Sequence, residues 1–362
     1  MACKTIVTVL GTRPEIIKLC VFIEELDSRT DEHLLVHTDQ HYDYEMDEVF
    51  MRELNVRAPD HRLRISNRRP SHQFGDMIAQ LGDLFESLSP RAVVVLGDTN
   101  STLAGAIAAK KSGTVLAHIE AGCRSFDKSM PEEQNRVVTD HLSDLLFAPS
   151  KTCMVNLARE GISGPGNHLV GSTLVDVCAR NLEIARNKPG LDLPPRYALM
   201  TIHRAINLSD KDRLSSILSA MAEVSHEIPV VFPVHPHTRE VMARWNMMSG
   251  LGNIQLVSPM GYLQFLRSLS GAEFVLTDSG GVQQEAQVLG IPILTARKET
   301  EWVETVTCGG CRLVDADSKM IVSESLKILN DATYNRSFRC SENPYSEKDV
   351  SRRIADILVK SV

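Results

Sequence analysis

A serine and two glycines stand where the chain could bind an anion. The segment 274–278 begins as an apolar strand and ends in polar residues, and Ser279, Gly280 and Gly281 then precede helix-forming residues. Paired glycines let backbone amides approach a ligand closely, and the N-terminus of a helix directs unpaired N–H groups toward negative charge. The pattern predicts a phosphate-binding loop, although a lone Ser-Gly-Gly is more often an ordinary turn.

Carboxylates follow two other strand-like segments. Asp98 comes after the apolar segment 92–96, and Glu120 comes directly after the segment 114–119. The carboxyl ends of parallel strands meet at one edge of a sheet, so both acids should face one crevice and could act there as acid and base. Capping of the next helix explains either acid alone equally well. Glu132 lies in a predicted first helical turn, where the helix dipole favours acids anyway.

Basic and imidazole side chains occupy similar positions. Arg13 and Lys18 lie at the start of a predicted helix and could reach a pyrophosphate, or could be solvated helix charges. His203 and His235 each follow an apolar strand-like segment. His235 and His237 flank a proline without a nearby acid, so we predict no metal site.

Strands alternating with helices surround these residues and predict an α/β protein. A chain of 362 residues is too long for one typical core. A glycine-rich stretch at 161–171 resembles a linker, and a polar, proline-containing break follows at 187–195. We therefore expect an N-terminal domain over 1–171 and a C-terminal domain over 172–345, with an amphipathic helix over 346–362 that packs back on the first domain.

Composition limits the function classes. Lysine and arginine number 39 against 46 acids, and the net charge of −7 argues against a broad surface for nucleic acid or anionic membrane. No apolar run approaches ~20 residues and no signal-peptide pattern is present, so we expect a cytoplasmic protein. The eight cysteines are scattered and are expected to be reduced thiols.

Taken together, several motifs carry a family resemblance. They are Gly11-Thr12-Arg13-Pro14-Glu15-Ile16-Ile17-Lys18, Gly97-Asp98-Thr99, His118-Ile119-Glu120-Ala121-Gly122, Pro131-Glu132-Glu133, Asn135-Arg136, His203-Arg204 and Thr277-Asp278-Ser279-Gly280-Gly281. Their order and spacing resemble those of the non-hydrolysing UDP-N-acetylglucosamine 2-epimerases. The resemblance spans nearly the whole chain.

The resemblance implies two Rossmann-like domains of the glycosyltransferase-B type, with a UDP-sugar in the cleft between them and no cofactor. It also implies a reaction in which UDP is eliminated across C1–C2 to leave 2-acetamidoglucal and then adds back. The C2 hydrogen is poorly acidic, so such an enzyme must stabilise the departing pyrophosphate and place a carboxylate by C2. A homodimer is a further expectation from the family.

The resemblance assigns roles residue by residue. The catalytic positions are Asp98, Glu120, Glu132 and His203. The substrate-binding positions are Arg13, Lys18, Arg136, His235, Ser279, Gly280, Gly281 and Glu285, of which Glu285 holds the ribose. Gln40 and His41 fall where bacterial relatives bind a second substrate molecule as an activator.

Departures from the family pattern leave alternatives open. Ile206 occupies a position that is usually Glu, which predicts a lost polar contact in that loop. The segment 297–302 resembles relatives that epimerise UDP-2,3-diacetamido-glucuronate, whose carboxylate would need a cation such as Arg297, Lys298 or Arg124. A hydrolysing 2-epimerase that releases N-acetylmannosamine is another possibility. A retaining glycosyltransferase and a catalytically silent UDP-sugar-binding regulator represent different classes.

Overall fold

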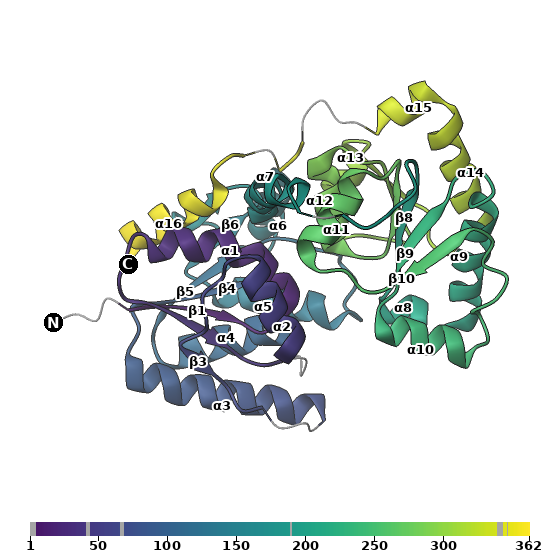
Figure 1. The fold of residues 1–362 in the computed structure, drawn as a ribbon. Coiled ribbons are helices and arrows are strands. Elements are labelled where there is room, and N and C mark those ends of the chain that lie inside the picture. Colours follow the sequence, from purple (N-terminus) through teal and green to yellow (C-terminus); the bar gives the residue numbers. More distant parts are fainter. Residues whose placement is uncertain (1–4, 41–43, 66–68, 189, 339–342, 346) are drawn as a thin grey trace. The chain divides into compact units, whose positions relative to one another are not determined.

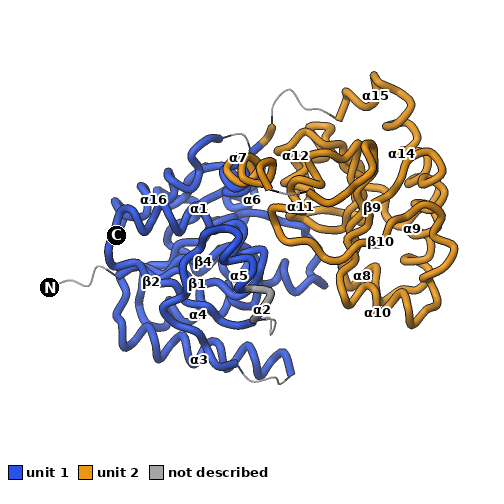
Figure 2. Tube along the Cα trace, in the orientation of Figure 1, with its two compact units in different colours: residues 1–177, 345–362 blue, residues 178–344 orange. Residues whose placement is uncertain are grey.

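The computed structural model describes residues 5–40, 44–65, 69–188, 190–338, 343–345 and 347–362. The chain forms two compact units (Figure 2). Unit 1 comprises Met1–Val177 and Tyr345–Val362, and unit 2 comprises Cys178–Pro344. Within the described residues, no helix is long and apolar enough to cross a membrane.

Unit 1 contains a seven-stranded sheet in the order β3-β2-β1-β4-β5-β6-β7, and its strand pairs are parallel. The strands are β1 (Ile6–Leu10), β2 (His33–His37), β3 (His61–Arg62), β4 (Ala92–Leu96), β5 (Val115–Ile119), β6 (Leu145–Ala148) and β7 (Asn167–Leu169). Strands β1 and β4 are buried along their whole length. Burial on both faces explains their uninterrupted apolar sequences.

The helices of unit 1 are α1 (Arg13–Asp27), α2 (Tyr44–Glu53), α3 (Pro70–Leu88), α4 (Asn100–Lys111), α5 (Pro131–Leu142), α6 (Lys151–Arg159) and α16 (Val350–Ser361), and α7 (Thr173–Arg186) runs across the boundary into unit 2. Helices α1 to α6 connect the parallel strands, and α16 adds a further helix to unit 1 (Figure 1). Helices α3 and α4 contribute to one core with the central strands. Helix α16 packs against α1, where Arg29 Nε donates to Asp356 Oδ1 at 2.7 Å.

Unit 2 contains a six-stranded sheet in the order β10-β9-β8-β11-β12-β13, with parallel pairs. The strands are β8 (Ala198–Thr201), β9 (Val230–Pro233), β10 (Ile254–Val257), β11 (Val275–Thr277), β12 (Ile293–Thr295) and β13 (Cys311–Leu313). The helices are α8 (Ala205–Leu208), α9 (Lys211–Val224), α10 (Pro236–Arg244), α11 (Tyr262–Ser270), α12 (Gly280–Leu289), α13 (Val303–Thr307), α14 (Ser318–Asn330) and α15 (Ala332–Ser337).

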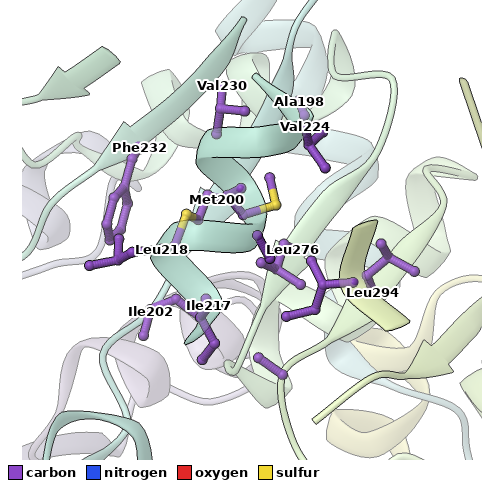
Figure 3. Close-up of a cluster of buried hydrophobic side chains, with 14 of the residues drawn as sticks. Ala198, Met200, Ile202, Ile217, Leu218, Val224, Val230, Phe232, Leu276 and Leu294 are labelled. Carbon is purple, nitrogen blue, oxygen red and sulfur yellow. The ribbon is translucent and has the colours of Figure 1, made fainter. Parts of the chain in front are cut away.

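Both faces of the sheet in unit 2 are covered by helices. On one face, side chains of α9 meet side chains of the strands in the core shown in Figure 3, for example Ile217 and Leu218 with Met200. On the other face, Leu199 and Val275 belong to a second core. Because successive strand residues point to opposite faces, one short apolar strand such as β8 supplies both cores.

The strand orders place one switch point in each sheet. In unit 1 the order reverses between β1 and β4, and in unit 2 it reverses between β8 and β11. Ligands of open α/β sheets bind at the carboxyl ends of strands beside such a point. Ligand-binding sites are therefore expected near the loops that follow these four strands. The predicted α/β class with two Rossmann-like domains is confirmed.

One detail of the sequence interpretation is wrong. The glycine-rich stretch at 161–171 resembles a linker in sequence. Instead, β7 lies in that stretch and pairs with β6, so that Phe147 aligns with His168. Gly166 allows a close approach here, since a Cβ on it would lie 2.1 Å from the carbonyl oxygen of Asp144.

Candidate functional site

Glu120 is the centre of the polar cluster in unit 1. It follows β5 directly, its φ is +71°, and it is only 6% exposed. Its Oε2 accepts a hydrogen bond from Lys18 Nζ at 2.7 Å, while its Oε1 has no hydrogen-bond partner among the described residues. A left-handed backbone at a non-glycine residue and an unsatisfied buried oxygen both cost free energy. Such costs concentrate at functional sites.

Lys18, one turn into α1, carries the charge that balances Glu120. Burial lowers the pKa of the Lys18 ammonium, but the Glu120 carboxylate outweighs burial, with a smaller contribution from Asp98, and the net shift is upward. Lys18 is therefore a permanent cation at neutral pH. It pairs with Oε2 of Glu120 and leaves Oε1 without a hydrogen-bond partner among the described residues.

Asp98 lies beside this pair on the loop after β4. Its carboxylate forms an ion pair with Arg136 Nη2, and its carbonyl oxygen accepts from Asn135 Nδ2 at 2.9 Å. A Cβ on Gly97 would lie 3.6 Å from Glu120 Oε2, so the loops after β4 and β5 are adjacent. The structure thus brings Asp98, Glu120, Lys18 and Arg136 together, as the sequence predicted for the two acids.

Helix α5 supplies Glu133 to the cluster and also carries Glu132. Glu133 is buried and accepts from Arg136 Nη1 at 2.7 Å and from the backbone N–H of Ser125 at 2.9 Å. Glu132, in the same helical turn, is partly exposed. Glu133 therefore fixes the loop before α5, whereas the position of Glu132 leaves it accessible to solvent.

Arg13 is the first residue of α1, and its guanidinium carbon lies over the Phe50 ring, 6.0 Å from the ring centroid.

Glu15 is a site residue that the sequence interpretation missed. Its Oε2 accepts from Gly11 N and Thr12 Oγ1, each at 2.9 Å, and its Oε1 accepts from Thr99 Oγ1 at 2.8 Å. This fully buried carboxyl therefore ties the loop after β1 to the loop after β4. Burial raises the pKa of Glu15, although these hydrogen bonds act in the opposite direction. Thr12 and Glu15 have capping-box spacing, but the bond to Thr99 spans 84 residues and leaves no local signal.

The strand, loop and helix predicted around Ser279 are present in unit 2. Ser279 caps α12, with its Oγ accepting from Val282 N, and Gly280 and Gly281 form the first turn. A Cβ on Gly280 would lie 2.5 Å from Glu301 Oε1, whereas Gly281 has no atom nearer than 3.9 Å. Only Gly280 is thus required by close packing. Glu285 is buried further along α12.

His203 lies across the switch point from this loop. Its side chain is half exposed, and its Nδ1 is 3.5 Å from Oδ1 of the fully buried Asp278. Asp278 was part of the quoted motif but was not assigned a role from the sequence. Ile206, where the family usually has Glu, is 55% exposed on α8. Asp278 also accepts from Asn207 Nδ2 at 3.0 Å, so the loop keeps polar anchors of its own.

Two further predicted positions, His235 and Gln40, have structural partners. His235 caps α10, where its Nδ1 accepts from the backbone N–H of His237 at 3.3 Å. Gln40 Oε1 accepts from the N–H and hydroxyl of Ser101 at 2.9 and 2.8 Å, so its amide supports the start of α4. His41 lies outside the described residues. In the described part of the chain, no group of three or more potential ligands could hold a metal ion.

Arg124 is not available to a ligand, contrary to one expectation. The residue is 2% exposed, its Nη1 pairs with Asp140 Oδ2, and its Nη2 pairs with Glu160 Oε2, both at 2.7 Å. Burial disfavours its charge, but the Glu160 and Asp140 carboxylates prevail and raise its pKa. Arg297 differs, because its Nη2 pairs with Glu301 at 2.8 Å while its buried Nη1 has no partner in the described residues.

Comparison with known proteins agrees with this geometry. The family model described as UDP-N-acetylglucosamine 2-epimerase matches residues 24–359. A UDP-N-acetylglucosamine 2-epimerase of Methanococcus maripaludis is 39% identical over 97% of each chain. The UDP-2,3-diacetamido-2,3-dideoxy-D-glucuronate 2-epimerase of Pseudomonas aeruginosa is also 39% identical, over 98% of this chain and 99% of its own.

Solved structures extend the comparison to the fold. The crystal structure of Methanocaldococcus jannaschii UDP-GlcNAc 2-epimerase in complex with UDP-GlcNAc and UDP is similar, with a TM-score of 0.91 and 38% identity. The match covers 98% of this chain and 99% of that one. The Neisseria meningitidis UDP-GlcNAc 2-epimerase bound to UDP-GlcNAc gives a TM-score of 0.90 at 29% identity, with 98% of this chain and all of that one covered. The chain therefore belongs to the UDP-N-acetylglucosamine 2-epimerase family.

Proposed function

We propose that this protein interconverts UDP-N-acetylglucosamine and UDP-N-acetylmannosamine by elimination of UDP and its re-addition. The observation that carries the proposal is the buried Glu120–Lys18 ion pair, with Asp98 near it, at the carboxyl ends of the strands beside the switch point of unit 1. Two neighbouring carboxylates are what removal and return of one proton require. Family membership supplies the substrate class.

In the first half-reaction, a carboxylate of the cluster takes the proton from C2. The C2–H electron pair becomes the C1=C2 double bond of 2-acetamidoglucal, and the C1–O bond breaks so that UDP leaves as a diphosphate anion. In the second half-reaction, a β-phosphate oxygen of UDP bonds to C1 while a carboxylic acid delivers a proton to the opposite face of C2. We assign these proton transfers to Asp98, Glu120 and Glu132.

The loop at the start of α12 is proposed to hold the diphosphate. The first backbone N–H groups and the positive end of the helix dipole stabilise the charge that develops as the C1–O bond breaks. His203 is proposed to assist at the same group, and Glu285 to hold the ribose. Arg13, Lys18, Arg136 and His235 complete the proposed binding residues.

Some properties follow from the family and are also proposals. We expect a cytoplasmic homodimer, and light scattering coupled to gel filtration tests the oligomeric state. Activation by a second substrate molecule near Gln40 and His41 predicts sigmoidal kinetics. A strictly hyperbolic rate over a wide substrate range would contradict it.

A second candidate is epimerisation of UDP-2,3-diacetamido-glucuronate. Arg297 favours it, because its buried Nη1 has no partner among the described residues and could bind the sugar carboxylate. The Pseudomonas relative is as similar in sequence as the archaeal enzyme. The neutral sugar remains the first choice, since the family model and most of the related names concern it.

Product analysis decides between these functions. The purified protein is incubated separately with UDP-N-acetylglucosamine and with the diacetamido-glucuronate nucleotide, and products are separated by ion-exchange chromatography. Conversion of the first to UDP-N-acetylmannosamine supports the proposal. Release of free N-acetylmannosamine and UDP would indicate a hydrolysing enzyme, and turnover of only the second nucleotide would favour the alternative. No conversion of either would contradict both.

A further inference from the structure

Asp278 occupies the switch point of unit 2. It follows β11 directly and is completely buried. An isolated carboxylate is costly to bury, and the cost is offset only by hydrogen bonds that favour its charged form. The partners of Asp278 are therefore informative about why an acid is present at this position.

Among the described residues, the hydrogen-bond donors to the Asp278 carboxylate all come from one loop. Both oxygens lie 3.1 Å from the backbone nitrogen of His203, and Oδ2 also accepts from Arg204 N at 2.9 Å. The Asn207 amide donates to the same Oδ2. These donors are 71–75 residues away in the sequence. Asp278 therefore organises the backbone that carries His203.

The same carboxylate also faces the imidazole ring. Asp278 Oδ1 is 3.5 Å from His203 Nδ1, which is within the distance of an ion pair. A carboxylate accepts hydrogen bonds and cannot donate them. It therefore favours a proton on Nδ1 and leaves Nε2 as the nitrogen that points away from it.

We propose that Asp278 is a positioning residue that fixes the orientation and tautomer of His203. The proposal rests on the proposed function only in giving His203 a role in the reaction. With Nδ1–H directed at Asp278, an imidazolium is stabilised and its Nε2–H can donate to the departing diphosphate. The same logic orients histidine in other enzymes, where a buried acid selects the productive tautomer.

The substitution Asp278→Asn tests the proposal with little change in shape. The amide oxygen at the Oδ2 position can keep the bonds from Arg204 and Asn207, while the NH2 group then faces His203 Nδ1. A donor at that place favours the opposite tautomer, with the proton on Nε2. Asn207 has further anchors, since its Oδ1 accepts from Arg213 Nη2 at 3.0 Å, so the loop should stay folded.

The first readout is the tautomer itself, from long-range 1H–15N NMR spectra of protein labelled at histidine, with the His203 signals assigned by their absence in His203→Gln. The wild-type protein is expected to show Nδ1–H or the imidazolium, and Asp278→Asn is expected to show Nε2–H. An Nε2–H tautomer in the wild-type protein would overturn the proposal even if the variant does not fold.

The second readout is catalysis on UDP-N-acetylglucosamine. Asp278→Asn is expected to lower kcat by about 100-fold, as for loss of general acid–base assistance, with KM changed less than about threefold. In a His203→Gln background it should cause no further loss. The matched control is Asp210→Asn, which alters an exposed acid that caps α9 through Asp212 N and Arg213 N but does not face His203.

The outcomes separate the two proposals. Asp210→Asn should leave tautomer and kcat unchanged. Equal losses from Asp278→Asn with and without the His203 side chain would reduce Asp278 to a structural role and overturn the inference. The expected tautomers in a protein that turns over no nucleotide sugar would support the inference while contradicting the proposed function.

Discussion

Removing the charge of Lys18 tests how the buried ion pair is balanced. The side chains of Lys18 and Glu120 are 12% and 5% exposed, and their charged atoms are 2.7 Å apart. Two unit charges at that distance attract by about 6 kcal/mol at an effective dielectric constant near 20. Lys18→Met leaves the Glu120 carboxylate buried without its cation, and we expect a net loss of about 3–5 kcal/mol of stability.

The assay is unfolding in urea and by heat, followed by circular dichroism. For a unit of about 200 residues, such a loss lowers Tm by roughly 6–20 °C. The double variant Lys18→Met/Glu120→Gln should recover most of the loss, because no buried charge remains. Lys110→Met is the matched control, since its pair with Asp144 is 32% and 43% exposed and should contribute about 1 kcal/mol or less.

Two results would refute this reasoning. A Lys18→Met protein within about 1 kcal/mol of the wild type would mean that solvent already screens Glu120. A double variant no more stable than Lys18→Met would mean that the uncompensated charge of Glu120 does not cause the loss.

Two further predictions concern Glu15 and the glycines of α12. Burial raises the pKa of Glu15 above its ordinary 4.5, so the folded state binds more protons than the unfolded state just above that value, and stability falls as pH rises through the window. In the Glu15→Gln variant, Tm should fall less between acid and neutral pH than in the wild type. Parallel plots of Tm against pH for the two proteins would contradict this prediction. Gly280→Ala should cost about 1–3 kcal/mol because its Cβ meets Glu301 and Trp302. Gly281→Ala should stabilise α12 by up to about 1 kcal/mol, because a Cβ at position 281 meets open space. Equal changes in Tm for Gly280→Ala and Gly281→Ala would count against the packing argument.

The sequence was sufficient wherever a feature is local. Asp98 and Glu120 follow buried apolar strands, and parallel topology brings the ends of those strands to one edge. Ser279 likewise follows a buried strand and caps a helix, as the glycine-rich pattern predicted. These predictions needed only the boundaries of apolar segments and the rules of α/β folds.

The sequence was not sufficient where hydrogen-bond partners are far apart in the chain, or where burial determines whether a side chain can reach a ligand. Asp278 is held by residues more than 70 positions earlier, so nothing nearby signals its role. Arg124 is a cation of the kind that binds anionic ligands, but it is buried and paired with two acids, so it cannot bind the substrate carboxylate. Strand β7 has three residues and a mixed polar sequence, so only its pairing with β6 identifies it.

The most direct test of the proposed chemistry is the fate of the C2 hydrogen in deuterated water. UDP-N-acetylglucosamine is incubated with the protein, and the C2 and anomeric protons of substrate and product are followed by proton NMR. Elimination and re-addition predict UDP-N-acetylmannosamine that carries deuterium at C2, with no such product from Glu120→Gln. Epimerised product that retains protium at C2 would contradict proton transfer through solvent-exchanging carboxylates.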